Sequence, residues 1–247
     1  MAITISGFTI EGGFKIEEKV VVPSGSIVFN GSTRYIASPA SSAFNFGTGD
    51  YTIEGWVYPT ASTRQDWINV TNESTFYRIA FYYTGTDIEY YAGSTSPGTG
   101  RISYTIAGSS LINGWRHIAL SRVSGSTRMF YNGTQVGSTY ADTLNFNNNG
   151  MGFVAGKDPA GITYMSGNMS NIRIVKGVGV YTGNFTVPNS PLTVTQSAGT
   201  NISAITAGQT QLLLNTTNDA NFLKDSSTNN FTITNNGGVV SSASNPF

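Results

Sequence analysis

An alternation of apolar and polar side chains, with a period of two residues, runs through most of this 247-residue chain. The segment YTIEGWVY, residues 51–58, is a clear example. Successive side chains of a β-strand point to opposite faces, so this pattern predicts strands with one buried face. No stretch of a dozen residues carries an apolar stripe at helical spacing. The chain is therefore expected to be all-β.

Tight turns separate these segments at short intervals. The chain has 29 glycines, and charged residues make up 11% of it, against roughly 25% in an average soluble protein. Asn132-Gly133 joins two apolar segments, and both residues tolerate the positive φ angles of a two-residue hairpin turn. Many short strands of this kind predict a sandwich of two antiparallel sheets. Strands are expected at residues 26–30, 33–37, 51–58, 76–83, 86–92, 101–107, 115–123, 127–131, 151–155 and 162–176.

Three parts of the chain differ in composition. Residues 1–24 alternate but are interrupted by glycines, and a strand edge of this kind is expected to pair with another copy or a neighbouring protein, as a docking or oligomerisation arm. Residues 25–183 hold the regular strand pattern of a core domain. Residues 184–247 are either a linker-like tail or a segment that wraps the sandwich. Wrapping is favoured, beside the first strand of the core, because the short strands 211–215 and 230–234 are too weak to fold alone.

Charge and residue content argue against several classes of function. Lys plus Arg and Asp plus Glu are 13 each, and no basic run is present, so no nucleic-acid partner is expected. Without cysteine there is neither a disulfide nor a thiolate metal site. No stretch approaches about 18 apolar residues, so membrane insertion is not expected. The N-terminal MAITISGFTIEGG lacks signal-peptide features, which predicts a protein made in the cytoplasm and not secreted by that route.

Four segments carry motifs in a consistent order: GSIVFNGSTRYIA (25–37), GDYTIEGWVYP (49–59), WRHIALSR…MFYNGTQVGS (115–138) and SGNMSNIRIVKGVGVY (166–181). Together they resemble the laminin G-like branch of the concanavalin A-like lectin/glucanase superfamily. The resemblance implies a concanavalin A-like jelly-roll sandwich whose concave face and rim loops are available to ligands. The later pattern LLLN…FLKDSSTNNFTITNNG is similar to segments of marine phage virion structural proteins.

The single histidine, His117, lies between a tryptophan and an apolar run. Alternation places it on one strand face with Ala119 and Ser121. The resembling family carries a histidine at the matching position in members without catalytic activity, which implies a structural role. A buried imidazole that is hydrogen-bonded across the sheet is therefore favoured over a ligand or a catalytic base.

Enzymatic activity is not expected. Glycoside hydrolysis needs two carboxylates roughly 5–10 Å apart. The glucanase branch of the resembling superfamily carries them on one E-x-D-x-E strand, and no such strand occurs in this sequence. Glu54 stands alone in its segment, while Asp87 and Glu89 come closest and are interpreted as a solvent-facing pair.

Calcium is the one candidate cofactor, because some laminin G-like domains bind this ion at the rim of the sandwich. Its hard oxygen ligands would come from Asp142, Asp158 and Asp225. None of the three has EF-hand spacing, and each equally suits an aspartate that caps its own turn.

Carbohydrate binding has the most support from residue chemistry. Sugar faces stack on exposed aromatic rings, while amides and carboxylates bond the hydroxyls. FYYTGTDIEYY, residues 81–91, carries four tyrosines around one turn, and alternation puts one ring of each adjacent pair outward. Cross-strand packing is the alternative for each ring taken singly. The candidate sugar-binding residues are Trp67, Tyr82, Tyr83, Asp87, Tyr90 and Tyr91.

These features predict a non-enzymatic virion surface protein with a lectin-like domain. In the favoured hypothesis it is a tail or fibre adhesin that binds host surface glycans. In the second it is a capsid decoration or head-fibre protein, anchored by its N-terminal arm, with weak or no glycan binding. The third is an unusual glycan hydrolase. Other virion proteins are expected to bind residues 1–25, and a homo-oligomer, preferably a trimer, is expected.

Overall fold

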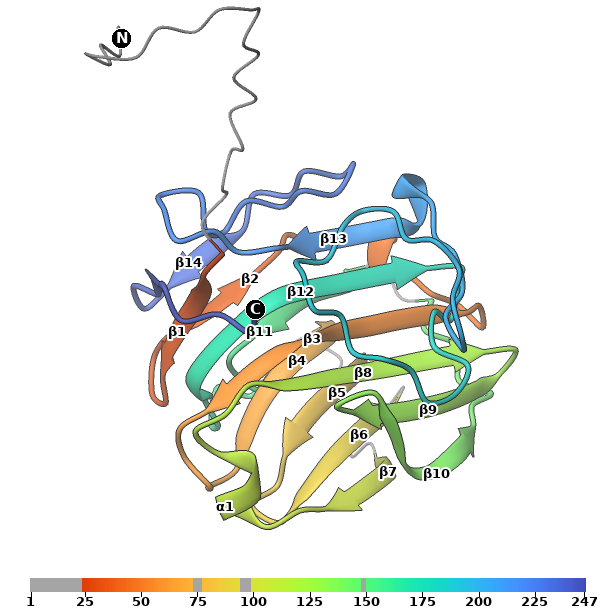
Figure 1. Ribbon diagram of the computed structural model, residues 1–247, viewed down its shortest axis with the longest axis horizontal. Coiled ribbons are helices and arrows are strands. Elements are labelled where there is room, and N and C mark those ends of the chain that lie inside the picture. Colours follow the sequence, from red (N-terminus) through yellow and green to blue (C-terminus); the bar gives the residue numbers. More distant parts are fainter. Residues whose placement is uncertain (1–23, 73–76, 94–98, 148–149) are drawn as a thin grey trace, which may run out of the picture.

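Two antiparallel β-sheets packed face to face make up the fold (Figure 1). The computed structural model describes residues 24–72, 77–93, 99–147 and 150–247. Within these ranges one sheet has eight strands and the other seven, which confirms the predicted all-β sandwich. The short helical turns are η1 (Ser42–Phe44), α1 (Gly108–Leu111) and η2 (Ala207–Gln209).

The eight-stranded sheet contains β1 (Ser26–Asn30), β3 (Tyr51–Pro59), β8 (Arg116–Val123), β9 (Ser126–Tyr131), β10 (Thr134–Ala141), β12 (Ser166–Lys176), β13 (Thr210–Leu214) and β15 (Val240–Ser242). Their order is β10-β9-β8-β3-β12-β1-β15, and β13 also pairs with β12. The seven-stranded sheet contains β2 (Tyr35–Ala37), β4 (Gln65–Asn72), β5 (Tyr77–Tyr83), β6 (Asp87–Gly93), β7 (Thr99–Thr105), β11 (Gly152–Ala155) and β14 (Thr234–Asn236). Their order is β14-β2-β11-β4-β5-β6-β7.

The predicted hairpin at Asn132-Gly133 forms. Both residues have positive φ angles, 48° and 76°, and Tyr131 pairs directly with Thr134 across the turn. Gly133 is also required by close packing, because a Cβ there would lie 2.3 Å from the backbone oxygen of Phe185. The turn therefore serves the β9–β10 hairpin and the contact with a later segment at once.

Residues 184–247 contribute strands to both sheets. β13 pairs with β12 and β15 pairs with β1 in one sheet, while β14 pairs with β2 in the other. The strand expected at 230–234 is wrong, because the pairing residues are those of β14 and β15. Residues 1–23 lie outside the described residues, so the arm expected at 1–24 stays a prediction.

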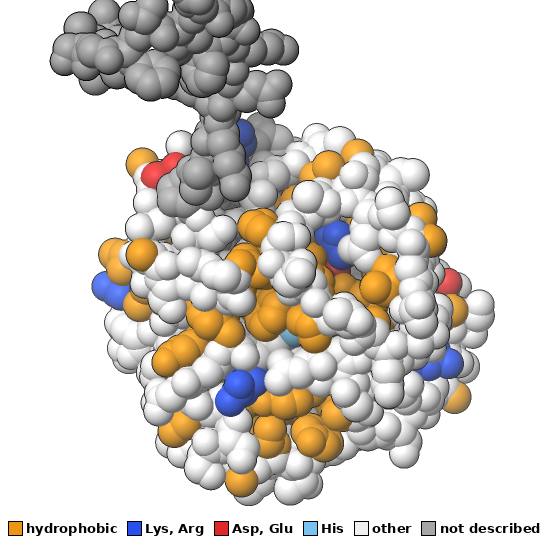
Figure 2. All heavy atoms as spheres, in the orientation of Figure 1, with side chains coloured by type: hydrophobic (Ala, Val, Ile, Leu, Met, Phe, Trp, Pro, Cys, Tyr) orange, Lys and Arg blue, Asp and Glu red, His pale blue; other side chains and the backbone are white. Residues whose placement is uncertain are grey.

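The main hydrophobic core lies between the two sheets, and a second, smaller cluster lies on the outer face of the eight-stranded sheet. Residues 177–205 cross that outer face in front of β12, β3 and β8 (Figure 1). The face also gathers hydrophobic side chains near its centre (Figure 2). Members of the second cluster come from both the sheet and the crossing segment: Ala119, Phe130, Val175, Val180, Tyr181, Phe185 and Ile205. One outer face is thus covered by the chain itself.

No helix within the described ranges is long and apolar enough to cross a membrane.

Candidate functional site

Three of the predicted sugar-binding rings belong to the main core. Trp67, Tyr83 and Tyr90 have no exposed surface. Trp67 stacks parallel to Tyr83 with ring centroids 6.4 Å apart, and the Tyr90 hydroxyl donates to Asp142 at 3.1 Å. A ring without an exposed face cannot stack on a sugar, so the assignment of these three residues is wrong. Tyr83 and Tyr90 are the inward members of their adjacent tyrosine pairs, as strand alternation requires.

The other three predicted residues lie on the outer face of the seven-stranded sheet. The Tyr82 hydroxyl donates to the Glu89 carboxylate, and the Arg78 guanidinium lies 4.2 Å from the centroid of the Tyr91 ring. Asp87 accepts hydrogen bonds from two threonine hydroxyls, each at 2.6 Å, which lower its pKa. Their part in sugar binding stays a prediction, and each already has a partner within the protein.

The three aspartates considered for calcium are buried in separate turns. Asp142 accepts from the hydroxyls of Tyr90 and Thr127 at 3.1 and 2.7 Å. Asp158 accepts two backbone N–H groups of its own turn at 2.7 and 2.9 Å. Asp225 accepts three backbone N–H groups at 2.9 to 3.0 Å, one of them from β13. Asp142, Asp158 and Asp225 therefore form no common site, and the described residues hold no cluster of three or more His, Cys, Asp or Glu arranged for a metal.

A hollow of about 480 Å³ lies on the outer face of the seven-stranded sheet. It forms because the outward positions of the strands there are small: Ala37 on β2, and Gly152 and Val154 on β11. Polar and aromatic side chains surround these small residues: Tyr35 on β2, Thr71 on β4, and Thr234 and Asn236 on β14.

The strand β4 supplies three buried polar side chains to this outer face. Asp66, Asn69 and Thr71 are at most 2% exposed, and Asp66 Oδ1, Asn69 Oδ1 and Thr71 Oγ1 have no hydrogen-bond partner. Thr71 also lines the hollow. A buried polar atom without a partner costs about 1–3 kcal/mol, so native proteins keep few of them. Three such atoms on one strand therefore call for an explanation, and a ligand can provide it only where the side chain adjoins open space.

Asp66 and Asn69 lie partly under the turn that follows β11. Thr163 donates to the Asp66 carboxylate at 2.7 Å, and Asn69 donates to the backbone oxygen of Lys157 at 3.0 Å. Burial raises the pKa of Asp66, and the nearby Asp158 adds to that rise. Of the three side chains that have an atom without a partner, Thr71 is therefore the one that lines open space.

The covered outer face of the other sheet holds a cluster of charged and polar side chains. Arg173 on β12 stands opposite Glu54 on β3 and binds its Oε1 through Nε at 2.8 Å and Nη2 at 2.6 Å. Tyr181 donates to Glu54 Oε2 at 2.6 Å. Burial alone would raise the pKa of Glu54, but Arg173, His117 and Tyr181 outweigh it and lower that pKa to about 2. We call Glu54, His117, Arg173 and Tyr181 the charged cluster.

His117 has the structural position that the sequence predicted. It has no exposed surface, and its Nε2 lies 3.2 Å from Oε2 of Glu54 on the adjacent strand. It lies on the outer face, beneath the segment that crosses it, and its ring packs edge-on against Phe185. The imidazole thus packs against the second cluster and does not lie in the core between the sheets.

A family model described as the concanavalin A-like lectin/glucanases superfamily matches residues 30–178, more than half of the chain. No curated protein matches the chain.

Among solved structures, the chain is similar to the native heptameric SAP-like pentraxin from Limulus polyphemus, with 12% identity and a TM-score of 0.55 over 92% of this chain and 98% of that chain. It is similar to domains LG4-5 of the mouse laminin alpha1 chain (14% identity, TM-score 0.48, 69% of this chain and 48% of that one). A putative carbohydrate binding protein from Bacteroides ovatus matches at 15% identity and a TM-score of 0.47, over 88% of this chain and 62% of that one. At these identities the pentraxin match shows a shared fold.

Proposed function

Because the chain belongs to the concanavalin A-like lectin/glucanases superfamily, we propose that it is a non-enzymatic carbohydrate-binding protein. The sugar binds in the hollow on the outer face of the seven-stranded sheet. Thr71 carries the proposal, because it lines this hollow and its hydroxyl, buried in the unbound protein, has no partner there. A rotation about χ1 turns the hydroxyl toward the hollow when a ligand binds. A ligand rich in hydroxyl groups supplies that partner.

The walls of the hollow match a neutral sugar. Tyr35 provides an aromatic ring, and the Lys157 ammonium lies 4.3 Å from its centroid. Thr234 and Asn236 add a hydroxyl and an amide, which can each donate to and accept from a sugar hydroxyl. A few polar groups set in a mainly uncharged concave surface are typical of small-molecule sites.

Hydrolysis has no support in this hollow, because none of the described residues that line it is a carboxylate or a histidine. Glycosidases need two carboxylates that flank the scissile bond. The carboxylates on the same outer face already accept from hydroxyls of the protein: Asp66 from Thr163, Glu89 from Tyr82, and Asp87 from Thr86 and Thr105. Binding without turnover is therefore the proposed activity.

The biological setting is part of the same proposal. The protein acts on a virion surface as a tail or fibre adhesin for host glycans, and it assembles as a homo-oligomer through residues 1–24. Support comes from the alternating N-terminal pattern, which needs a partner edge, and from the likeness of the C-terminal pattern to phage structural proteins. A capsid decoration or head-fibre protein, anchored by the same arm, is the alternative.

The proposal is tested by titrating the full-length protein with neutral oligosaccharides, followed by isothermal calorimetry. Thr71→Val keeps the shape of the side chain and removes only the hydroxyl, and Asn236→Ala removes an amide from the wall. We expect each variant to weaken binding about tenfold, which corresponds to the loss of about one hydrogen bond in a buried site.

Thr134→Val is the matched control. Thr134 is exposed on β10 of the opposite sheet and lies outside the hollow, so this variant should bind as the unmodified protein does. Equal affinities for Thr71→Val, Asn236→Ala and the control would contradict the proposed site. The absence of binding to every neutral oligosaccharide tried would contradict the proposed function.

A further inference from the structure

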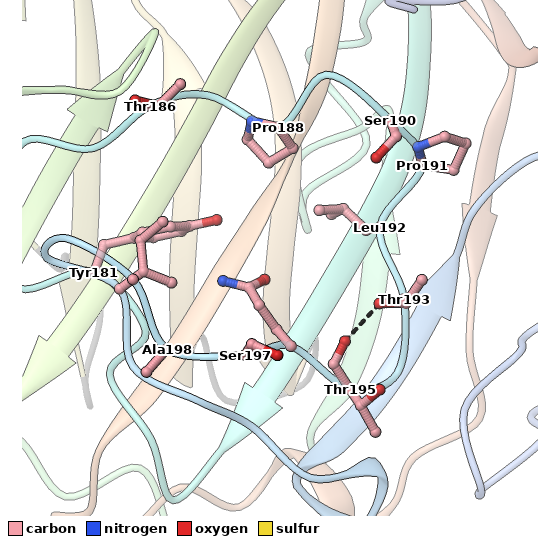
Figure 3. A pocket seen from close by; sticks show the side chains of 13 residues that line it. Tyr181, Thr186, Pro188, Ser190, Pro191, Leu192, Thr193, Thr195, Ser197 and Ala198 are labelled. Atoms are coloured by element: carbon pink, nitrogen blue, oxygen red, sulfur yellow. Dashed lines mark hydrogen bonds between the residues drawn. The ribbon is translucent and has the colours of Figure 1, made fainter.

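A second hollow, of about 610 Å³, lies on the covered outer face of the eight-stranded sheet. The loop that follows Tyr181 encloses it. Pro188, Pro191 and Leu192 lie along one stretch of that loop, with Tyr181 and Ala198 across the hollow from them (Figure 3). These residues come after residue 178, where the match to the family model ends. The family therefore gives no expectation for this hollow.

None of the described residues that line this hollow has a charged side chain. The proline rings and Leu192 make an aliphatic wall. Threonine and serine hydroxyls and the amide of Gln196 supply the polar groups. A charged ligand would lose water here without gaining a counter-charge, since the nearest charges, Glu54 and Arg173, are fully buried and paired with each other.

The charged cluster fixes the polar wall of the hollow from below. Arg173 Nη1 donates to the backbone oxygen of Thr193 at 3.0 Å, and Nη2 donates to Gln196 Oε1 at 2.6 Å. Because Arg173 can only donate, the amide orientation of Gln196 is settled: its oxygen faces Arg173. The Nε2 group is then left to donate into the hollow that Gln196 lines.

We propose that this hollow is a second binding site, which takes one neutral sugar residue. The sugar lays its C–H face on the wall of Pro188, Pro191 and Leu192 and accepts a hydrogen bond from Gln196 Nε2. Arg173 is a positioning residue, since it orients Gln196 and lies beneath the hollow. The site is separate from the hollow of the seven-stranded sheet, so one chain binds two sugars on opposite faces. The two hollows share no lining residue, so this second site can be tested separately from the proposed function.

The test uses Gln196→Glu in the full-length protein, with chitotriose and cellotriose as probes. A glutamate at this position still accepts from Arg173, so the loop keeps its anchor, but an oxygen replaces the donating Nε2. Gln135→Glu on β10 is the matched control, because it makes the same change of charge outside both hollows. Equal unfolding midpoints of the two variants establish that both are folded.

We expect two bound trisaccharides per unmodified chain and one per Gln196→Glu chain, with at least tenfold weaker binding at the altered site. In a 15N spectrum, the side-chain amide signal of Gln196 is identified as the one that is missing from Gln196→Glu. This signal should shift when the probe is added to the unmodified protein. Retention of both sites in Gln196→Glu, or an unmoved amide signal, overturns the second site.

Failure of this site and failure of the proposed function are told apart by Thr71→Val. One bound sugar that is lost in Thr71→Val and kept in Gln196→Glu overturns the second site alone. One bound sugar that is lost in Gln196→Glu and kept in Thr71→Val overturns the site on the seven-stranded sheet alone. No binding of either probe overturns the second site for neutral sugars.

Discussion

The outer faces of the two sheets differ in whether their buried polar side chains have hydrogen-bond partners within the protein. On the eight-stranded sheet, Glu54 and Arg173 are fully buried, and the segment of residues 177–205 covers them and completes their hydrogen bonds. On the seven-stranded sheet, Thr71 is almost as deeply buried, yet its hydroxyl has no partner. The chain itself completes the Glu54–Arg173 pair on one face, where only the Nδ1 atom of His117 in the charged cluster lacks a partner, and it leaves Thr71 without one at a hollow on the other.

This difference separates residues that hold the fold together from residues that are available to a ligand. A buried charge is tolerated when its hydrogen bonds are satisfied, and its position is then fixed. An unsatisfied buried hydroxyl weakens the fold and adds no rigidity. Burial alone therefore does not identify a functional residue, and neither does a missing partner, because Trp67 Nε1 and His117 Nδ1 are buried and lack one as well. Thr71 differs from them because it also lines a hollow.

The largest effect is expected when one member of the completed pair is removed. Arg173→Met leaves the Glu54 carboxylate buried without its counter-charge, so we expect the free energy of unfolding to fall by about 3–5 kcal/mol. Urea unfolding followed by tryptophan fluorescence measures this loss.

The double variant Glu54→Leu/Arg173→Met removes both charges, and it should recover at least about half of the loss. If the single variant were as stable as the unmodified protein, Glu54 would not need its partner. The contrast between the two faces would then disappear.

A smaller effect is expected from acid. The pKa of Glu54 is about 2 in the folded protein and 4.5 in its ordinary state, so its ionised form stabilises the fold. This contribution is complete above pH 4.5 and is lost as the pH falls from there toward about 2. Its size is on the order of 3 kcal/mol. Unfolding midpoints measured across that range should fall steeply in the unmodified protein and less steeply in Glu54→Gln.

Asp66, on the outer face of the seven-stranded sheet, has a pKa shift opposite in direction to that of Glu54. Burial raises its pKa above 3.8, so its ionisation costs the folded state free energy as the pH rises through and beyond that value. Asp66→Asn should therefore raise the stability at neutral pH relative to its effect at pH 3. If Asp66→Asn lowered the stability at neutral pH, the hydrogen bonds to the Asp66 carboxylate would outweigh the cost of its burial, as they do for Glu54.

The sequence was sufficient for the fold class because most strands alternate, and for the Asn132-Gly133 turn because its chemistry is local. It was insufficient for β4, whose segment QDWINVTN carries polar residues of low strand propensity. These polar residues face outward from a strand with neighbours on both sides, β11 and β5, a position that only the assembled sheet defines. Tertiary pairing outweighed local preference there.

The same limit applied to the sites. Alternation predicted that one tyrosine of each adjacent pair would face outward, but not that Tyr83 and Tyr90 would be the inward ones. No local signal could link Gln196 to Arg173, which lie 23 positions apart, or reveal that the Thr71 hydroxyl lacks a partner. A strand segment with several short polar residues and no clear alternation is the one sequence feature that could have pointed to the open face.

The smallest and most specific effect is expected from Thr71→Val. The variant removes a buried hydroxyl that has no partner, so the fold should become more stable by up to about 1 kcal/mol. Sugar binding at the adjoining hollow should weaken in the same variant, because the hydroxyl is then no longer available to the ligand. Chemical unfolding and calorimetric titration of one preparation measure both changes. A variant that loses stability would mean that Thr71 has a structural partner, and the open face would then be as complete as the covered one.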